Sequence, residues 1–161
     1  LIGNKNSVNS STINLTILIG SSNNLSRLFN ETYGVKFIDG NLTVVEFNFN
    51  FSLYALNLTK LTINKQLPNE TGYFLVKGLA MPSGTTKTMY VDRINKKLSN
   101  ACIKDDEVSG TSEISKGCRS ANEFKIRCDG RLRKSYRCAY NSTSNKYKVE
   151  GLKNSAIMQI R

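Results

Sequence analysis

Histidine is absent from this chain of 161 residues, and several classes of functional site are absent with it. Serine and cysteine triads that use an imidazole base cannot form. The sequence also has no glycine-rich phosphate loop and no dinucleotide fingerprint between a strand and a helix. No apolar run reaches the length that spans a membrane. What remains for an enzyme is a carboxylate pair of the kind that glycosidases use.

One acidic run, Asp105, Asp106 and Glu107, offers neighbouring carboxylates. Adjacent acidic side chains in a loop more often cap a helical turn or contact solvent than form a catalytic pair. A calcium site that adds Glu113 would match no established loop spacing. We therefore expect no catalytic residues, no metal and no cofactor.

Cysteine is scarce, and the four present are Cys102, Cys118, Cys128 and Cys138. The number is even, and without a Cys-x-x-Cys pair or histidine a structural zinc site is disfavoured. Two disulfides are the better interpretation, and three pairings are open. We favour Cys128–Cys138, because the turn signal at 129–130 predicts a bridged hairpin, with Cys102–Cys118 closing a loop. The alternative is four buried thiols in a reducing compartment.

Acceptor tripeptides for N-linked sugar, Asn-x-Ser/Thr, are abundant instead. With 19 asparagines and 29 serines and threonines, chance would give about three. Nine occur, at Asn9, Asn14, Asn24, Asn30, Asn41, Asn50, Asn57, Asn69 and Asn141. An asparagine-rich, AT-biased genome is one explanation, but a chain coated with glycan is the one we favour. With the disulfides it predicts an extracellular or cell-surface location, and the start at Leu1 is what we expect of a mature product.

Positive charge is unevenly distributed along the chain, whose net charge is +11. The densest basic run contains Lys125, Arg127, Arg131, Arg133, Lys134 and Arg137. A solvated hairpin face is the most common meaning of such a run, followed by contact with acidic polysaccharide or an acidic neighbouring subunit. Specific nucleic-acid recognition is disfavoured, because aromatic residues for base stacking occur only at the two ends of the run, at Phe124 and Tyr136.

Strand-like alternation dominates the pattern of apolar residues. Residues 45–53 alternate apolar and polar with period two, and a change of phase predicts a bulge or turn near 54–60. Further strands are predicted at 13–19, 35–38, 73–79, 87–93, 123–128, 136–140, 146–152 and 156–160. Short helical turns are predicted only at 23–31 and 107–115. The fold class that we predict is all-β: an antiparallel, Ig-like β-sandwich with a disulfide-stapled C-terminal β module.

Three parts of the chain are expected. Residues 1–22 form an N-terminal segment with a possible donor strand, 23–94 a glycosylated sandwich, and 95–161 a basic four-cysteine part that is also compatible with packing as one unit with 23–94. The first strand carries Ile13, Leu15, Ile17 and Ile19. It either joins its own sheet or completes a sheet in a neighbouring subunit.

Two stretches resemble extracellular β-domain modules in predicted surface proteins of archaea. One is VVEFNFNFSLYALNLTKLTI…GYFLVKGL…TTKTMYVDR (44–93), and the more specific one is the four-cysteine run NACIKDDEV…YKVEGLKNSAI (100–157). The resemblance implies a secreted or wall-associated glycoprotein, in the class of pilus-like filaments or surface layers. It supplies no catalytic residues.

The leading hypothesis is therefore a structural subunit of an extracellular filament or surface layer that assembles through β-strand complementation. Its partners would be copies of itself and covalent N-linked glycans. The alternative is a secreted adhesin or carbohydrate-binding module whose basic hairpin binds acidic polysaccharide. Neither hypothesis requires a specific nucleic acid, a membrane span in this chain or an enzyme activity.

Overall fold

The computed structural model describes residues 12–67, 71–79, 81–154 and 156–161. Within these ranges the chain is all-β, with one short 3-10 turn, η2 (Thr111–Glu113), and no α-helix. The strands are β1 (Leu15–Ile19), β2 (Thr32–Asp39), β3 (Leu42–Asn50), β4 (Thr62–Lys65), β5 (Tyr73–Lys77), β6 (Lys87–Asp92), β7 (Asn100–Lys104), β8 (Glu123–Arg127), β9 (Leu132–Arg133), β10 (Tyr136–Asn141), β11 (Lys146–Leu152) and β12 (Ala156–Ile160).

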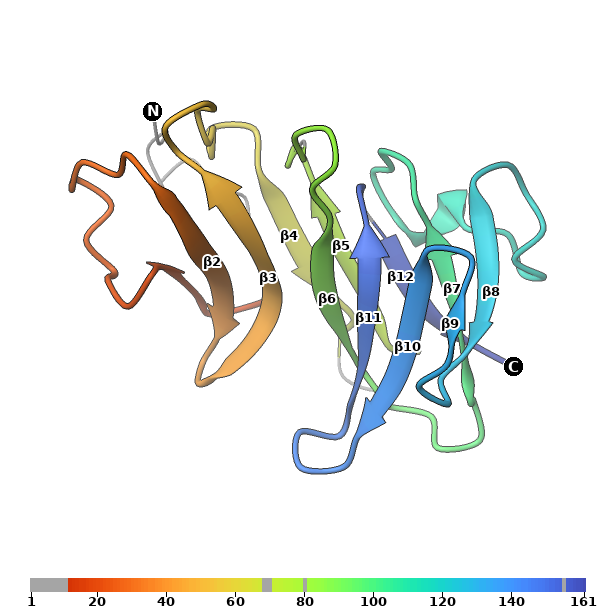
Figure 1. The fold of residues 1–161 in the computed structure, drawn as a ribbon. Coiled ribbons are helices and arrows are strands. Elements are labelled where there is room, and N and C mark those ends of the chain that lie inside the picture. Colours follow the sequence, from red (N-terminus) through yellow and green to blue (C-terminus); the bar gives the residue numbers. More distant parts are fainter. Residues whose placement is uncertain (1–11, 68–70, 80, 155) are drawn as a thin grey trace.

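Two antiparallel sheets pack face to face (Figure 1). The larger sheet has seven strands in the order β1-β2-β3-β6-β11-β10-β9, and the smaller has five in the order β4-β5-β12-β7-β8. The predicted antiparallel β-sandwich with a disulfide-stapled C-terminal part is confirmed. Both sheets contain strands from before and after residue 94, so the two halves of the chain share one sandwich.

The β2–β3 hairpin shows how the alternating sequence builds the sheet. Its turn places Gly40 at a positive φ of 64°, a conformation that glycine adopts without a steric penalty. Val45, Phe47 and Phe49 point inward and are buried. The strand ends at Asn50, earlier than predicted, because the Asn50 side chain accepts a hydrogen bond from the Ser52 N–H and turns the chain.

Three details of the predicted secondary structure are wrong. Residues 23–31 form no helix, because the Asn24 side chain accepts the N–H of Ser26 and holds an irregular turn. Only η2 remains of the helical turn predicted at 107–115. The strands β4, β7 and β9 were not predicted; in β7 a short apolar core is followed at once by charged residues, a pattern typical of a loop.

The apolar residues form two cores. The main core fills the space between the sheets, and Ala101, Ile103 and Ile157 point into it. The residues that alternate with these, Cys102 and Ala156, point to the outer face of the five-stranded sheet and belong to a second, smaller core. The connection from β7 to β8 covers this outer face with Val108 and Ile114.

Candidate glycosylation and assembly surfaces

The predicted sugar acceptors lie where strands begin, end or connect. Asn9 and Asn69 are outside the described residues, and of the other seven, six are exposed and Asn50 is half-buried. They are Asn14 before β1, Asn24 and Asn30 between β1 and β2, Asn41 in the β2–β3 turn, Asn50 at the end of β3, Asn57 between β3 and β4, and Asn141 at the end of β10. An attached sugar at these positions would project from turns and strand ends into solvent.

Four of these acceptors each form a turn of the same hydrogen-bonded type. The Oδ1 atoms of Asn24, Asn50, Asn57 and Asn141 each accept the backbone N–H two residues later, at 2.9–3.1 Å. At Asn50 and Asn57 the same oxygen also accepts the hydroxyl of Ser52 or Thr59, at 2.5 Å. The turn engages the amide oxygen and leaves Nδ2, the atom to which an N-linked sugar is joined, outside the ring of hydrogen bonds.

The strand predicted to contact a neighbouring subunit lies at the edge of the larger sheet. β1 pairs antiparallel with β2 from Leu15–Asp39 to Ile19–Val35, so within one molecule it completes its own sheet. Ile17 and Ile19 are 2% and 1% exposed and belong to the main core, while Ile13 and Leu15 are half-buried against it. The side of β1 away from β2 is the edge of this sheet.

A connection of twelve residues joins β1 to β2. It begins with a tight turn in which Ile19 and Ser22 exchange backbone hydrogen bonds of 2.9 and 3.1 Å. Gly20 in this turn has a φ of 62°. Most of the connection is exposed, and its Leu28 is 83% exposed. Phe29, near its end, is buried in the main core beside the rings of Tyr33 and Phe51, so the part of the connection that is free to change conformation is the mostly exposed stretch 20–28.

A charged cluster of Asp39, Lys65, Asp92 and Lys146 lies at one end of the sandwich, where β2, β4 and β6 end and β11 begins. Lys65 Nζ is 2.5 Å from Asp39 Oδ2 and 3.7 Å from Asp92 Oδ2, and Lys146 pairs closely with Asp92. Burial opposes charge on Asp92, but hydrogen bonds and attraction from Lys146 outweigh it and lower its pKa. The Lys65–Asp39 ion pair thus connects β2, the strand next to β1, to β4 of the other sheet.

Another buried cation, Lys87, begins β6. Its side chain is among the fully buried ones, and Nζ donates to the Lys153 carbonyl at 2.9 Å. Burial lowers the pKa of Lys87 to about 8, against the attraction of Asp105 and Glu107. This lysine therefore weakens the fold at neutral pH, where it must be buried with its charge.

The predicted basic run does not form one face. Lys125 and Arg127 are exposed on the outer side of β8, and Arg131 is exposed in the following turn. Arg133 is held by both carboxylate oxygens of Asp129, at 2.6 and 2.7 Å, which lowers the pKa of Asp129. Lys134 lies 4.5 Å over the Phe124 ring, and Arg137 lies on β10 at 4.0 Å from Glu150. The six cations are therefore divided between two sheets and a turn.

Both favoured disulfides are present. Cys128–Cys138 joins β10 of the larger sheet to the end of β8 in the smaller one, with a Cα–Cα distance of 4.4 Å. Cys102–Cys118 closes the loop that covers the second core, at 5.7 Å. Both predicted pairings are confirmed, but the predicted bridged hairpin is wrong, because β8 and β10 belong to different sheets and β10 pairs with β9 instead.

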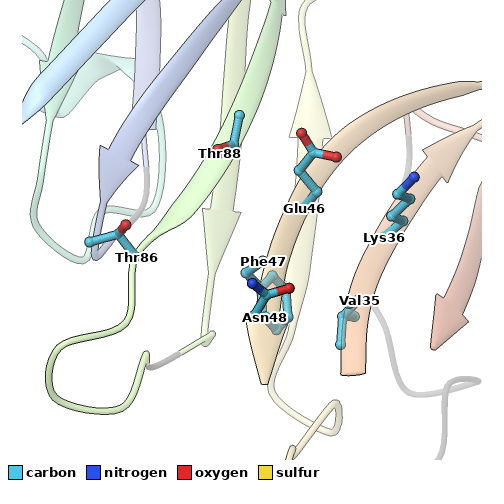
Figure 2. Close-up of a pocket in the computed structure, with 8 residues that line it drawn as sticks. Val35, Lys36, Glu46, Phe47, Asn48, Thr86 and Thr88 are labelled. Atoms are coloured by element: carbon cyan, nitrogen blue, oxygen red, sulfur yellow. The ribbon is translucent and has the colours of Figure 1, made fainter. Parts of the chain in front are cut away.

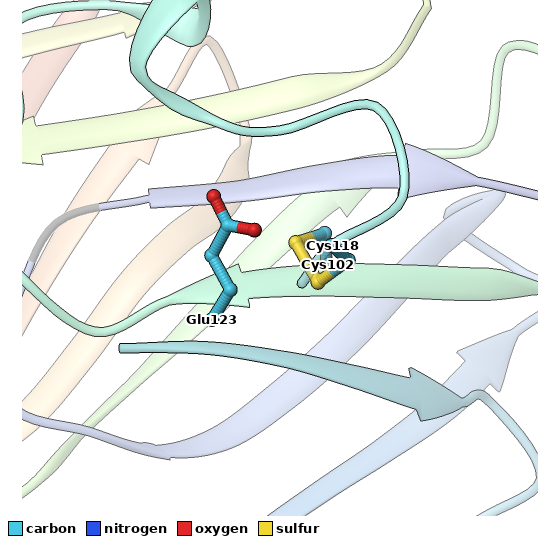
Figure 3. Close-up of side chains that lie close together, drawn as sticks. All are labelled: Cys102, Cys118 and Glu123. Carbon is cyan, nitrogen blue, oxygen red and sulfur yellow. A yellow bond between two sulfur atoms is a disulfide. The ribbon is translucent and has the colours of Figure 1, made fainter. Parts of the chain in front are cut away.

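Figure 3 shows Glu123 beside the Cys102–Cys118 disulfide, a grouping whose ligand atoms lie within 4.8 Å of one another. Because the two sulfur atoms are bonded to each other, they offer no thiolate to a metal. The carboxylate of Glu123 accepts hydrogen bonds from Ser115 and Ser120 and pairs with Lys104 at 3.7 Å. These bonds lower the pKa of Glu123 despite burial, and they make it an anchor for the loop.

The acidic residues 105–107 also make hydrogen bonds that hold the fold together. Asp105 accepts hydrogen bonds from the Tyr136 hydroxyl at 2.6 Å and from the Asn154 N–H at 2.7 Å. Glu107 accepts the N–H of Gly78 at 3.0 Å. Carboxylates in this loop thus hold three different segments, and they do not cap the helical turn as predicted.

A hollow of about 270 Å³ lies on the outer face of β2 and β3, beside β6 (Figure 2). It forms over Gly34, which has no side chain, and its polar walls include Lys36, Glu46, Asn48 and Thr88. Its position matches a divergence of the sheet, because β3 and β6 pair only at Val45–Met89 and Glu46–Thr88. Glu46 is also bonded to the Tyr90 hydroxyl at 2.8 Å.

Sequence reasoning missed the charged cluster, the hollow over Gly34 and the role of Glu123. Their members are far apart along the chain, and no spacing in the sequence signals them.

Comparison of the chain with models of known protein families, with curated proteins and with solved structures found no match. The resemblance to archaeal surface modules therefore stays a prediction. In the part of the chain that the structure describes, no helix is both long enough and apolar enough to cross a membrane.

Proposed function

We propose that the protein is a structural subunit of an extracellular, N-glycosylated filament or surface layer, and that copies assemble by exchanging β1. The observation that carries this proposal is the edge strand β1. It places Ile17 and Ile19 in the core yet is joined to the rest of the sheet by an exposed connection of twelve residues. A strand attached in this way can make the same contacts with β2 of a neighbouring copy.

Exchange would conserve most of the interaction energy. The pairing of β1 with β2 and the burial of its isoleucines are identical within one molecule and between two, so only the connection changes conformation. Local concentration then decides between the closed monomer and the chain of copies.

Location outside the cell is supported by two observations. Disulfides persist in oxidising compartments, and this chain has two that staple separate regions. The seven described acceptors are at turns and strand ends, where a sugar would not disturb the core. Sugars at Asn24 and Asn30 would keep the connection hydrated and would discourage pairing of the edge with unrelated strands.

A test of strand exchange has to leave the monomer folded. Charged residues at Ile17 and Ile19 would unfold the monomer as well as block assembly, because both side chains are in the core. A disulfide between β1 and β2 would block exchange without changing a core side chain. Leu18 and Lys36 are directly opposite on β1 and β2 and point away from the core, so L18C/K36C can form a disulfide within one molecule.

We expect the glycosylated wild type to form regular fibres or sheets in electron micrographs at neutral pH. The oxidised L18C/K36C protein should remain monomeric, and the matched L18S/K36S variant should assemble as the wild type does. Assembly of the locked variant would refute strand exchange. A wild type that stays monomeric at every concentration tested would refute the structural role.

A further inference from the structure

A second hollow, of about 240 Å³, lies where β3 and β5 end and the β3–β4 connection passes over them. Its floor is apolar and includes Phe49, Leu56 and Leu79, all nearly inaccessible to solvent. Asn57 and Lys60 supply polar groups to its lining. Binding sites for drug-sized molecules are about 300–1,000 Å³, so this hollow suits a smaller group such as one sugar ring.

Asn57 is held rigidly at this hollow. The residues on either side, Leu56 and Leu58, are 2% and 0% exposed and fix the backbone to the core. Thr59 donates to Asn57 Oδ1 from its N–H at 2.9 Å and from its hydroxyl at 2.5 Å. A group joined to Nδ2 would therefore start from a fixed position instead of swinging freely.

One wall of the hollow is built from backbone. Gly78 has a φ of 81°, and a Cβ there would be 2.1 Å from the Lys60 carbonyl oxygen, so no other residue fits without a shift of the chain. The Gly78 N–H is bound by Glu107 at 3.0 Å. The close approach and this bond hold the hollow in shape.

We propose that the hollow seats the first sugar residue of an N-linked glycan on Asn57, and that this contact stabilises the β3–β4 connection. A sugar ring has an apolar face of C–H groups and a rim of hydroxyls, which matches an apolar floor beside the polar residues Asn57 and Lys60. The inference rests on the glycosylation in the proposed function, but not on strand exchange. It gives the sugar on Asn57 a structural role that is not proposed for the sugars on the other acceptors.

Asn141 is the matched control. Its Oδ1 accepts the N–H of Thr143 at 3.0 Å in the same kind of turn, but it lies at the exposed end of β10 and lines neither hollow described above. The variants N57Q and N141Q each remove one attachment site. Each is prepared in glycosylated form and, from a host without N-glycosylation, in unglycosylated form.

The experiment combines peptide mass spectrometry, which measures occupancy, with Tm by calorimetry. We expect both sites to be occupied in the wild type. Each substitution also removes the side-chain hydrogen bond of its turn, so N57Q should lower the Tm of the glycosylated protein by about 3 °C more than that of the unglycosylated protein, whereas N141Q should lower both by the same amount. A55L places a larger side chain at the rim of the hollow. Asn57 should still carry sugar in this variant, but the increase in Tm that the sugar provides should be lost.

Each contrary result has a separate meaning. If N57Q lowered the Tm of the glycosylated and unglycosylated proteins equally, or if Asn57 were unoccupied beside other occupied acceptors, the proposed sugar contact would be overturned and the proposed function would stand. A wild type in which no acceptor carries sugar would overturn the seat together with the glycoprotein proposal.

Discussion

The two edges of the sandwich are held in different ways. Where β8 ends beside β10, Cys128–Cys138 joins the sheets covalently. At the other edge, β1 is held by pairing with β2 over five positions and by the burial of Ile17 and Ile19. The closed edge releases no strand unless its disulfide is reduced, whereas the β1 edge opens when non-covalent contacts break. The strand exchange that we propose therefore uses the β1 edge.

The largest effect is expected at the charged cluster beside the β1 edge. Asp92→Ala leaves Lys146, whose side chain is 5% exposed, without its carboxylate partner, and should lower the free energy of unfolding by about 3–4 kcal/mol. Because the pKa of Asp92 lies below the ordinary 3.8, its contribution is present at neutral pH and is lost as pH falls through the lowered value. Urea unfolding between pH 2 and 7 measures both effects.

Asp129→Ala is the control for that experiment, because it breaks an ion pair on the exposed turn of the closed edge. Screening by solvent makes such a pair contribute little, so no measurable change in unfolding is expected. An equal loss of stability in the two variants would show that the charged cluster has no special role.

A somewhat smaller loss of stability is expected when the Cys128–Cys138 disulfide is removed. The double variant C128S/C138S removes a bridge across 10 residues and should cost about 3 kcal/mol, mostly through the entropy of the unfolded chain. Hydrogen exchange should speed up in β8–β10 relative to β1 and β2, beyond the overall loss of stability. If β1 amides lose the same extra protection, the two edges are coupled and the contrast between them fails.

The smallest effect should come from Lys87, which belongs to neither edge. Lys87→Met removes a buried charge and should raise the free energy of unfolding at pH 7 by roughly 2 kcal/mol. Since the pKa of Lys87 is about 8 in the fold and 10.5 ordinarily, the unfolded chain holds more protons between these values. Wild-type stability relative to the variant should therefore rise from pH 8 to 10. A constant difference across that range would show that Lys87 keeps its ordinary pKa.

Much of the fold could be predicted because local patterns agree with it. Alternation around Phe47 and Phe49 specifies an inward face of β3, and the turn signal at 129–130 brings Cys128 near Cys138. Hydrophobic period and turn chemistry act over a few residues, so the sequence displays them directly. The predicted sandwich and both disulfides depended on these signals.

The remaining features depend on contacts between distant segments. Asp39, Lys65, Asp92 and Lys146 meet only because four strands begin or end at the same end of the sandwich. The basic run looked continuous in sequence, but the chain passes from the five-stranded to the seven-stranded sheet between β8 and β10, so Arg127 and Arg137 lie on different sheets. The hollow beside Asn57 likewise requires Gly78, which is remote in the chain.

The two disulfides also limit how far the chain can be stretched. If β1 and β12 were pulled apart with a single-molecule tether, the chain drawn out between them would contain both bridges. The bridges enclose separations of 16 and 10 residues, so roughly 80 Å of contour length stays closed even after the strands come apart. A pulled subunit would therefore lengthen less than its residue count implies, and the closed edge would act as a mechanical stop.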